Sequence, residues 1–137
     1  MSEHSASPRH ERVHDPRAID EHLRAQLPRW SREGACIQRR YRTAGWKASV
    51  LAVGAIAHLA EAAWHHPDLS VGYDHVVVRL STHSAGGVTD KDFELAARIE
   101  QLLTWNPARQ PGSALEGTPD DPRFAYLPPD EAPKTAR

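Results

Sequence analysis

The chain has 137 residues, of which 39% are hydrophobic and 26% are charged, and its formal net charge is −1. This length and balance indicate one globular domain, and the small net charge argues against a strong attraction to nucleic acid or to an acidic membrane surface. Cys36 is the single cysteine, so no intrachain disulfide can form. Because we also find neither a secretory signal nor an apolar run long enough to cross a bilayer, we expect a cytoplasmic protein.

The N-terminal part of the sequence predicts an arm, a short helix and a hairpin. Residues 1–14 are polar without a periodic pattern, which is typical of a disordered arm. An amphipathic helix is predicted over 15–27, because Pro16 suits the first helical position and apolar residues recur at helical spacing. A β-hairpin follows, with strands predicted at 30–33 and 36–42.

The middle of the chain predicts a long helix, a second hairpin and a third helix. Strong helix formers dominate residues 44–64, and Pro67 closes this helix. Its apolar stripe comprises Trp46, Val50, Val53 and Ala57. Alternating apolar residues then predict strands over 69–73 and 76–80. A pattern similar to a capping box opens a third helix, over 89–103.

This order of elements, α-β-β-α-β-β-α, predicts an α+β fold with a four-stranded antiparallel sheet and helices packed on one face. We expect one domain over residues 15–104. Most of the prolines lie in residues 105–137, which are predicted to form an irregular C-terminal extension. Trp105 and Phe124 are too apolar for a fully solvated tail, so part of the extension is expected to dock on the domain or on a neighbouring subunit.

The residues that point to chemistry lie around the end of the second predicted helix. Glu61 and His65 are four residues apart and therefore share a helix face, while His66 lies where Pro67 breaks the helix. His83 ends the second strand of the following hairpin, where it can meet the other imidazoles. Imidazole gives or takes a proton near neutral pH, so two of them can serve as acid and base in one turnover. Such a set suits the elimination of water.

Other roles for the same residues stay open on this evidence. Adjacent histidines at a helix C-terminus can act as cations that favour the helix dipole. Three histidines can also bind zinc, although two sequence neighbours are unusual ligands for one metal. Taken singly, Glu61 could be a surface carboxylate, Asp92 a helix cap and Tyr73 a half-buried strand aromatic.

The whole set resembles the motif of the pterin-4a-carbinolamine dehydratase family (4a-hydroxytetrahydrobiopterin dehydratases). That family carries an acidic residue, three further residues and then His-His-Pro, followed by an aromatic residue, a histidine and an aspartate. The matching residues are Glu61, His65, His66, Pro67, Tyr73, His83 and Asp92. The resemblance covers roughly residues 18–103. It departs at Arg29, where the family usually has glycine, and at Leu69, where animal members have tryptophan.

The resemblance implies a hydro-lyase that converts 4a-hydroxytetrahydropterin to quinonoid dihydropterin and so recycles the cofactor of aromatic amino-acid hydroxylases. It implies that His66 and His83 form the acid/base pair, while His65 orients the pterin or shares the proton transfer. Glu61 is expected to hold His65 or to accept from the amino-amide edge of the pterin, and Asp92 is expected to orient His83. The substrate-binding or supporting residues implied are Glu61, Pro67, Tyr73, Thr82 and Asp92.

The same resemblance carries expectations about partners. It implies a pterin substrate and no metal or organic cofactor. A homodimer or homotetramer is expected, formed through an exposed sheet edge and through helices. The alternative function is a non-catalytic binding module of the same fold, because relatives act as a transcriptional cofactor or as a RuBisCO assembly factor. Intact acid/base residues favour the enzyme over the binding module.

Overall fold

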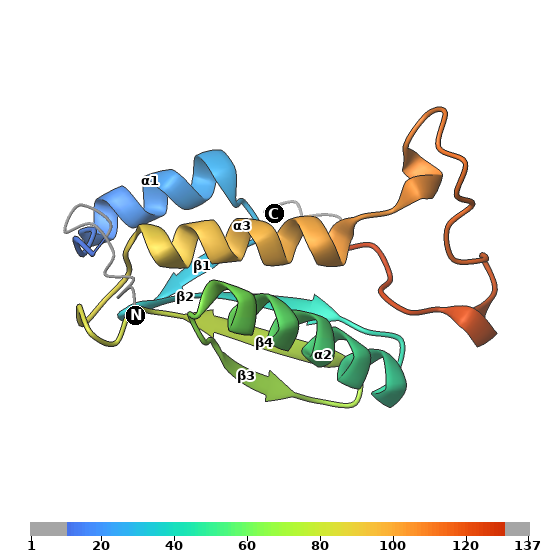
Figure 1. The fold of residues 1–137 in the computed structure, drawn as a ribbon, viewed down its shortest axis with the longest axis horizontal. Coiled ribbons are helices and arrows are strands. Elements are labelled where there is room, and N and C mark those ends of the chain that lie inside the picture. Colours follow the sequence, from blue (N-terminus) through green and yellow to red (C-terminus); the bar gives the residue numbers. More distant parts are fainter. Residues whose placement is uncertain (1–10, 131–137) are drawn as a thin grey trace, which may run out of the picture.

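The computed structural model describes residues 11–130 of the chain. Within them, the element order α-β-β-α-β-β-α and the α+β fold are confirmed (Figure 1). The strands form one antiparallel sheet in the order β1-β2-β4-β3. The bounds are α1 Pro16–Gln26, β1 Ser31–Glu33, β2 Cys36–Arg42, α2 Trp46–Ala63, β3 Asp68–Val71, β4 His75–Leu80 and α3 Asp90–Thr104, with short 3₁₀ helices at Pro107–Arg109 and Pro122–Phe124.

One face of the sheet is covered by the helices. Alternate residues of the two central strands are buried on this face, while their neighbours are more exposed, which is the pattern of a sheet with one covered face. In register, Tyr41 of β2 lies opposite Val76 of β4, and both side chains are buried. The buried hydrophobic side chains of these two strands are Ile37, Tyr41, Val76, Val78 and Leu80.

The turn between β3 and β4 differs from the expectation by one or two residues. The amide of Gly72 donates to the carbonyl oxygen of His75 at 2.8 Å, so the turn spans residues 72–74. His75 begins β4, whereas Asp74 and His75 had been expected to form the turn. Tyr73 therefore lies in the turn and not in a strand.

Helix α2 buries a different face from the predicted one. Trp46 is 54% exposed, and Val50 and Ala57 are also exposed, so three of the four residues in the predicted stripe point outward. The buried face comprises Ala48, Ser49, Ala52, Ile56 and Ala60. The prediction was wrong because the helix is apolar nearly all round, so periodicity alone does not select a face. Small side chains let the helix lie close to the sheet.

The C-terminal extension docks on the domain near its end. It leaves α3, makes a wide excursion and returns beside the body of the molecule (Figure 1). The carbonyl oxygen of Tyr126 accepts from the amide of Ala44 at 2.9 Å, and Leu127 packs against the core. This agrees with the expectation that part of the extension docks.

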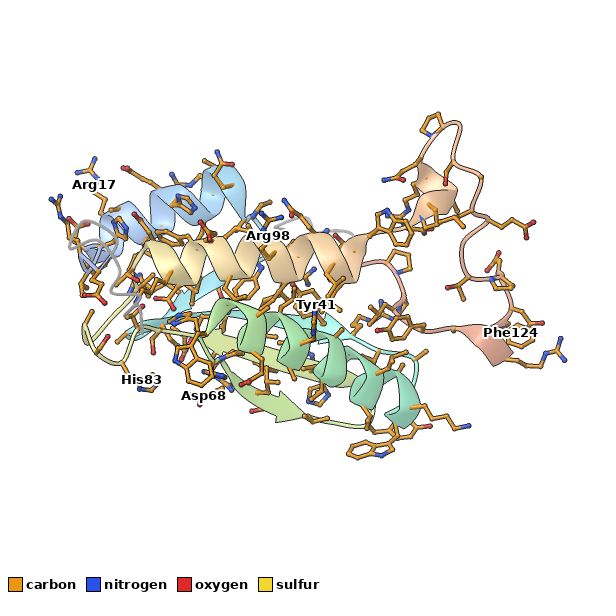
Figure 2. The ribbon with its side chains drawn as sticks, viewed as in Figure 1. Arg17, Tyr41, Asp68, His83, Arg98 and Phe124 are labelled. Atoms are coloured by element: carbon orange, nitrogen blue, oxygen red, sulfur yellow. The ribbon has the colours of Figure 1, made fainter. Side chains whose placement is uncertain are left out.

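A buried cluster of charges anchors this return. Arg39 of β2 is only 4% exposed, and its guanidinium donates hydrogen bonds to the carboxylate of Glu100 and to that of Asp130. Glu100 also accepts from the Tyr41 hydroxyl at 2.7 Å and from the Trp30 indole at 3.0 Å. Figure 2 shows Tyr41 inside the molecule, between α3 and the sheet. Two carboxylates and a buried cation satisfy one another here, which the burial of an arginine requires.

Residues 11–14 do not behave as the disordered arm that was predicted for residues 1–14; the first ten of these lie outside the described residues. The amide of His14 donates to the carbonyl oxygen of Val88 at 2.9 Å, and the His14 ring lies 2.7 Å from Asp90. These contacts attach the segment to the loop before α3. No helix within residues 11–130 is long and apolar enough to cross a bilayer.

Candidate active site

A shallow pocket of about 250 Å³ lies where the end of α2 meets the loop between β4 and α3. It brings together the three histidines that the sequence singled out and the predicted Thr82. Its lining residues are Trp64, His65, His66, Ser81, Thr82, His83, Ser84 and Lys91. Trp64, Ser81, Ser84 and Lys91 were not predicted, although all of them are sequence neighbours of predicted residues.

The end of α2 sets the directions of two histidines. Trp64 adopts the left-handed conformation, with φ 52°, directly after the last helical residue. The amides of Trp64 and His65 donate back to Glu61 and Ala60 carbonyl oxygens at 3.2 and 3.1 Å. This arrangement ends the helix and reverses the chain. His65 and His66 consequently leave the helix and no longer follow its i, i+4 spacing.

His65 pairs with Asp92, not with Glu61. Asp92 is fully buried in the first turn of α3, and its Oδ1 lies 2.6 Å from Nε2 of His65. Oδ2 of Asp92 accepts from the Thr82 hydroxyl at 2.8 Å and from the Thr89 amide at 2.9 Å. One carboxylate therefore connects the histidine, the loop and the helix start. The expectations that Glu61 holds His65 and that Asp92 orients His83 are both wrong.

Glu61 pairs instead with His66. Its Oε1 lies 2.7 Å from Nε2 of His66, and both side chains are largely exposed. The left-handed turn at Trp64 explains the exchange, because it carries His65 away toward α3 and brings His66 back over the last turn of α2. An exposed pair of this kind holds a ring less firmly than a buried one.

His83 lies in a tight turn at the rim of the pocket. The carbonyl oxygen of Thr82 accepts from the amides of Ala85 and Gly86 at 3.0 and 2.9 Å, which closes the turn around His83. Figure 2 shows the His83 side chain pointing outward from this loop. Within residues 11–130, no side-chain hydrogen bond holds its imidazole. The ring is therefore available to a bound molecule.

Residues 11–14 support the loop that carries His83, which the sequence did not indicate. Val13 packs so closely on Gly87 that a Cβ at this glycine would lie 2.7 Å from its Cγ1. Glu11 Oε1 lies 3.2 Å from Nζ of the pocket residue Lys91. Together with the His14 contacts, these interactions tie residues 11–14 to the C-terminal end of the loop and to the first turn of α3.

Four predicted residues do not line the pocket, namely Glu61, Pro67, Tyr73 and Asp92. Glu61 and Asp92 form hydrogen bonds with histidines that do line it. Tyr73 is 71% exposed and lies beside Gly45, near the start of α2, whereas the histidines lie at its other end. Pro67 follows His66 and does not line the pocket. Sequence spacing placed Tyr73 in the motif, but the direction of the hairpin carries it away.

Two further features of the described residues bear on other kinds of site. No group of three or more His, Cys, Asp or Glu side chains within residues 11–130 is arranged to hold a metal ion. A larger hollow, of about 710 Å³, lies between the C-terminal extension and α3. None of the pocket histidines lines it, and Arg39 and Asp130 at its wall are engaged with each other.

Comparison with known proteins identifies the family. The model of the family described as Pterin 4 alpha carbinolamine dehydratase matches residues 12–102, which is more than half of the chain. The chain belongs to this family. The resemblance stated from the motif is therefore confirmed. The match ends before the C-terminal extension, so the family accounts for the domain and the pocket but not for residues 105–137.

Similar members of the pterin 4 alpha carbinolamine dehydratase family come from several bacteria. A protein of Aquifex aeolicus named "Putative pterin-4-alpha-carbinolamine dehydratase" is 51% identical over 67 residues, which is 49% of this chain and 68% of that protein. A protein of the same name from Chloroflexus aggregans is 50% identical over 86 residues, covering 62% and 90%. The crystal structure of a transcriptional coactivator/pterin dehydratase from Brucella melitensis matches with a TM-score of 0.61 at 27% identity, covering 66% of this chain and 98% of that one.

Proposed function

We propose that this protein dehydrates 4a-hydroxytetrahydropterin to quinonoid dihydropterin and thereby recycles the pterin cofactor of aromatic amino-acid hydroxylases. The family and its similar members are named after this hydro-lyase class, which is the class expected from the sequence. The observation that carries the proposal is the hydrogen bond between buried Asp92 and His65 beside His66 and His83. A carboxylate buried against an imidazole in a pocket is a recurrent device for proton transfer.

The reaction needs one proton donor and one proton acceptor. The bond between C4a and the hydroxyl oxygen breaks, and that oxygen takes a proton and leaves as water. N5 loses its proton, and its electron pair forms the double bond to C4a. No electrons are gained or lost overall, so two histidines in suitable positions can supply all of the chemistry.

We assign the base to His65. An ionised carboxylate only accepts hydrogen bonds, so Oδ1 of Asp92 takes the Nε2–H of His65. In the neutral imidazole, Nδ1 then carries the lone pair that can accept the proton from N5. This choice departs from the expectation that His66 and His83 form the pair, because Glu61, which hydrogen-bonds to His66, is exposed, whereas Asp92 is buried.

We assign the acid to His83 and a binding role to His66. The His83 ring is exposed at the pocket rim and can carry the proton for the departing hydroxyl. His66 lines the pocket at the end of α2, and Glu61 hydrogen-bonds to it there, where a carboxylate can accept from the amino-amide edge of a pterin. Thr82 supports this arrangement through its hydrogen bond to Asp92.

The protein is proposed to act in the cytoplasm as a homodimer or homotetramer. The outward face of α2 carries the exposed apolar side chains Trp46, Val50 and Leu51, which a second copy could cover. Strands β1 and β3 are the edges of the sheet and can pair with another chain. A binding module, such as a transcriptional cofactor or a RuBisCO assembly factor, is the alternative. Exposed Trp105 and Phe124 in the extension are its best support.

The deciding experiment measures the rate of 4a-hydroxytetrahydropterin dehydration with the wild-type protein, His83→Ala and His58→Ala. His58 is an exposed histidine on α2 outside the pocket and serves as the matched control. His83→Ala is expected to reduce turnover by about 100-fold, the size of a lost acid/base group, while His58→Ala has no effect. Folded wild-type protein that does not exceed the spontaneous rate would contradict the enzyme and favour the binding module.

A further inference from the structure

Trp64 has an unusual conformation for a large side chain. It is the single non-glycine residue with positive φ among residues 11–130, and its side chain is 75% exposed. The left-handed position after a helix normally holds glycine or asparagine, because a Cβ there meets the following carbonyl group. A bulky residue at this position is both strained and poorly buried. Folding alone gives no reason for tryptophan here, and such outliers gather at functional sites.

The indole lies at the wall of the histidine pocket. Its ring centroid is 5.0 Å from that of His66, with the planes at 83°, so the two rings make an edge-to-face contact. A contact of this kind cannot cover both faces of the indole. The exposed fraction of the side chain is consistent with an open aromatic face beside the pocket.

Every other side chain that lines the pocket is polar. They are His65, His66, Ser81, Thr82, His83, Ser84 and Lys91. These groups can donate or accept hydrogen bonds, but they offer little apolar area to a flat heteroaromatic ring. Binding sites for such ligands usually combine a few polar groups with aromatic or apolar walls. Trp64 is the lining residue that can provide this wall.

We propose that Trp64 is the stacking surface for the fused ring of the pterin. This inference rests on the proposed function and adds the residue that selects a flat ring. Stacking of a nucleobase on an aromatic side chain strengthens binding by roughly 5- to 100-fold, and a pterin has a similar planar ring. The strained conformation places the indole beside His66, so the pterin ring would lie between Trp64 and the polar groups of the loop.

The test measures the affinity for biopterin, a stable pterin that cannot be dehydrated, by titration calorimetry. Trp64→Asn keeps a residue that tolerates the left-handed conformation but removes the aromatic ring. Trp64→Tyr keeps an aromatic face. Trp105→Asn removes an exposed tryptophan outside the pocket and is the matched control.

Trp64→Asn is expected to weaken biopterin binding about 10-fold or more, while Trp64→Tyr stays within about 3-fold of the wild type. Trp105→Asn should bind as the wild type does. The melting temperature of Trp64→Asn is expected to rise by about 3 °C, because the strain at this position is relieved. Stability and affinity should therefore change in opposite directions, which a loss of folding would not produce.

Unchanged affinity in Trp64→Asn would overturn the inference, as would a change in oligomeric mass by light scattering without a change in affinity. The latter result would assign the indole to a subunit contact. Turnover separates this inference from the proposed function. If the wild-type protein dehydrates the substrate and Trp64→Asn has an unchanged KM, only the stacking role of Trp64 is refuted. If the wild-type protein binds biopterin through Trp64 but shows no turnover, only the dehydratase activity is refuted.

Discussion

Asp92 and His65 are 27 residues apart in the sequence, yet Oδ1 of one lies 2.6 Å from Nε2 of the other. Asp92 also completes the capping box with Thr89 that starts α3. A residue that caps the start of the helix thus also orients the proposed base. Because Asp92 is fully buried, its direction is set by the packing of α3 and not by solvent.

The first prediction concerns this pair. Asp92→Asn is expected to lower kcat by about 100-fold, because the amide no longer selects the tautomer in which Nδ1 of His65 accepts a proton. The two residues act as a unit, so the double variant Asp92→Asn/His65→Ala should be about as slow as His65→Ala alone. Steady-state kinetics on the three variants measures this coupling.

Glu61→Gln is the comparison variant for the Asp92 and His65 substitutions. The contact between Glu61 and His66 is exposed, so its loss is expected to reduce kcat by less than about 10-fold. A loss in kcat as large as that of Asp92→Asn would show that the pair of Glu61 and His66 contributes as much to turnover as the pair of Asp92 and His65, which contradicts this prediction. Melting temperatures of all variants check that the buried network of Asp92 has not simply collapsed.

The second prediction concerns the contact between Val13 and Gly87. Gly87→Ala places a Cβ 2.7 Å from Cγ1 of Val13, which is too close, and it is expected to reduce the free energy of unfolding by about 1 kcal/mol. Adding Val13→Ala should restore most of the lost stability, because it removes the Cγ1 atom that the new Cβ would contact. Denaturant unfolding of the two single variants and the double variant measures the coupling. Equal effects of Gly87→Ala with and without Val13 would show that residues 11–14 do not rest on the loop.

The third prediction concerns the anchor of the C-terminal extension at low pH. The hydrogen bond from the Arg39 guanidinium, opposed by partial burial, holds the pKa of Asp130 below its ordinary value of 3.8. A carboxyl group with a depressed pKa in the folded state adds stability above its unfolded pKa, and this stability is lost as the pH falls through the folded value. The contribution should therefore be full at neutral pH and disappear in acid.

Asp130→Asn measures this contribution. The free energy of unfolding of the variant is expected to be about 1 to 2 kcal/mol lower than that of the wild type near pH 7. The difference should shrink as the pH falls below the ordinary pKa of 3.8. Asp120→Asn, at an exposed position of the same extension, is the control and should have no effect. A constant difference at all pH values would mean that charge is not the basis of the anchor.

The fourth prediction concerns the outward face of α2. Leu51 is 60% exposed, and Leu51→Lys is expected to reduce the oligomeric mass measured by light scattering without lowering the stability of the separate chain. The position of Glu61 at the end of the same helix should not change in this variant, so unchanged pterin binding would show that the variant is folded. An unchanged mass would place the subunit contact elsewhere, with the sheet edges as the next candidates.

Local patterns in the sequence were enough to predict the order and approximate bounds of the elements. Asp15 accepts from the amide of Ala18 at 2.8 Å, as expected for an N-cap before Pro16, and Thr89 caps α3 in the same way. Such contacts join residues two or three apart, so spacing alone predicts them. The gathering of His65, His66 and His83 was also predicted, because it requires only that a helix end lies beside a strand end.

The tertiary structure alone decided which carboxylate meets which imidazole, which face of α2 is buried and where Tyr73 lies. The rule that residues four apart meet holds only while the chain is helical, and the left-handed turn at Trp64 ends it before His65. The docking of Asp130 on Arg39 joins residues 91 apart. Contacts of this kind depend on how rigid elements pack against one another, and a short stretch of sequence does not determine that packing.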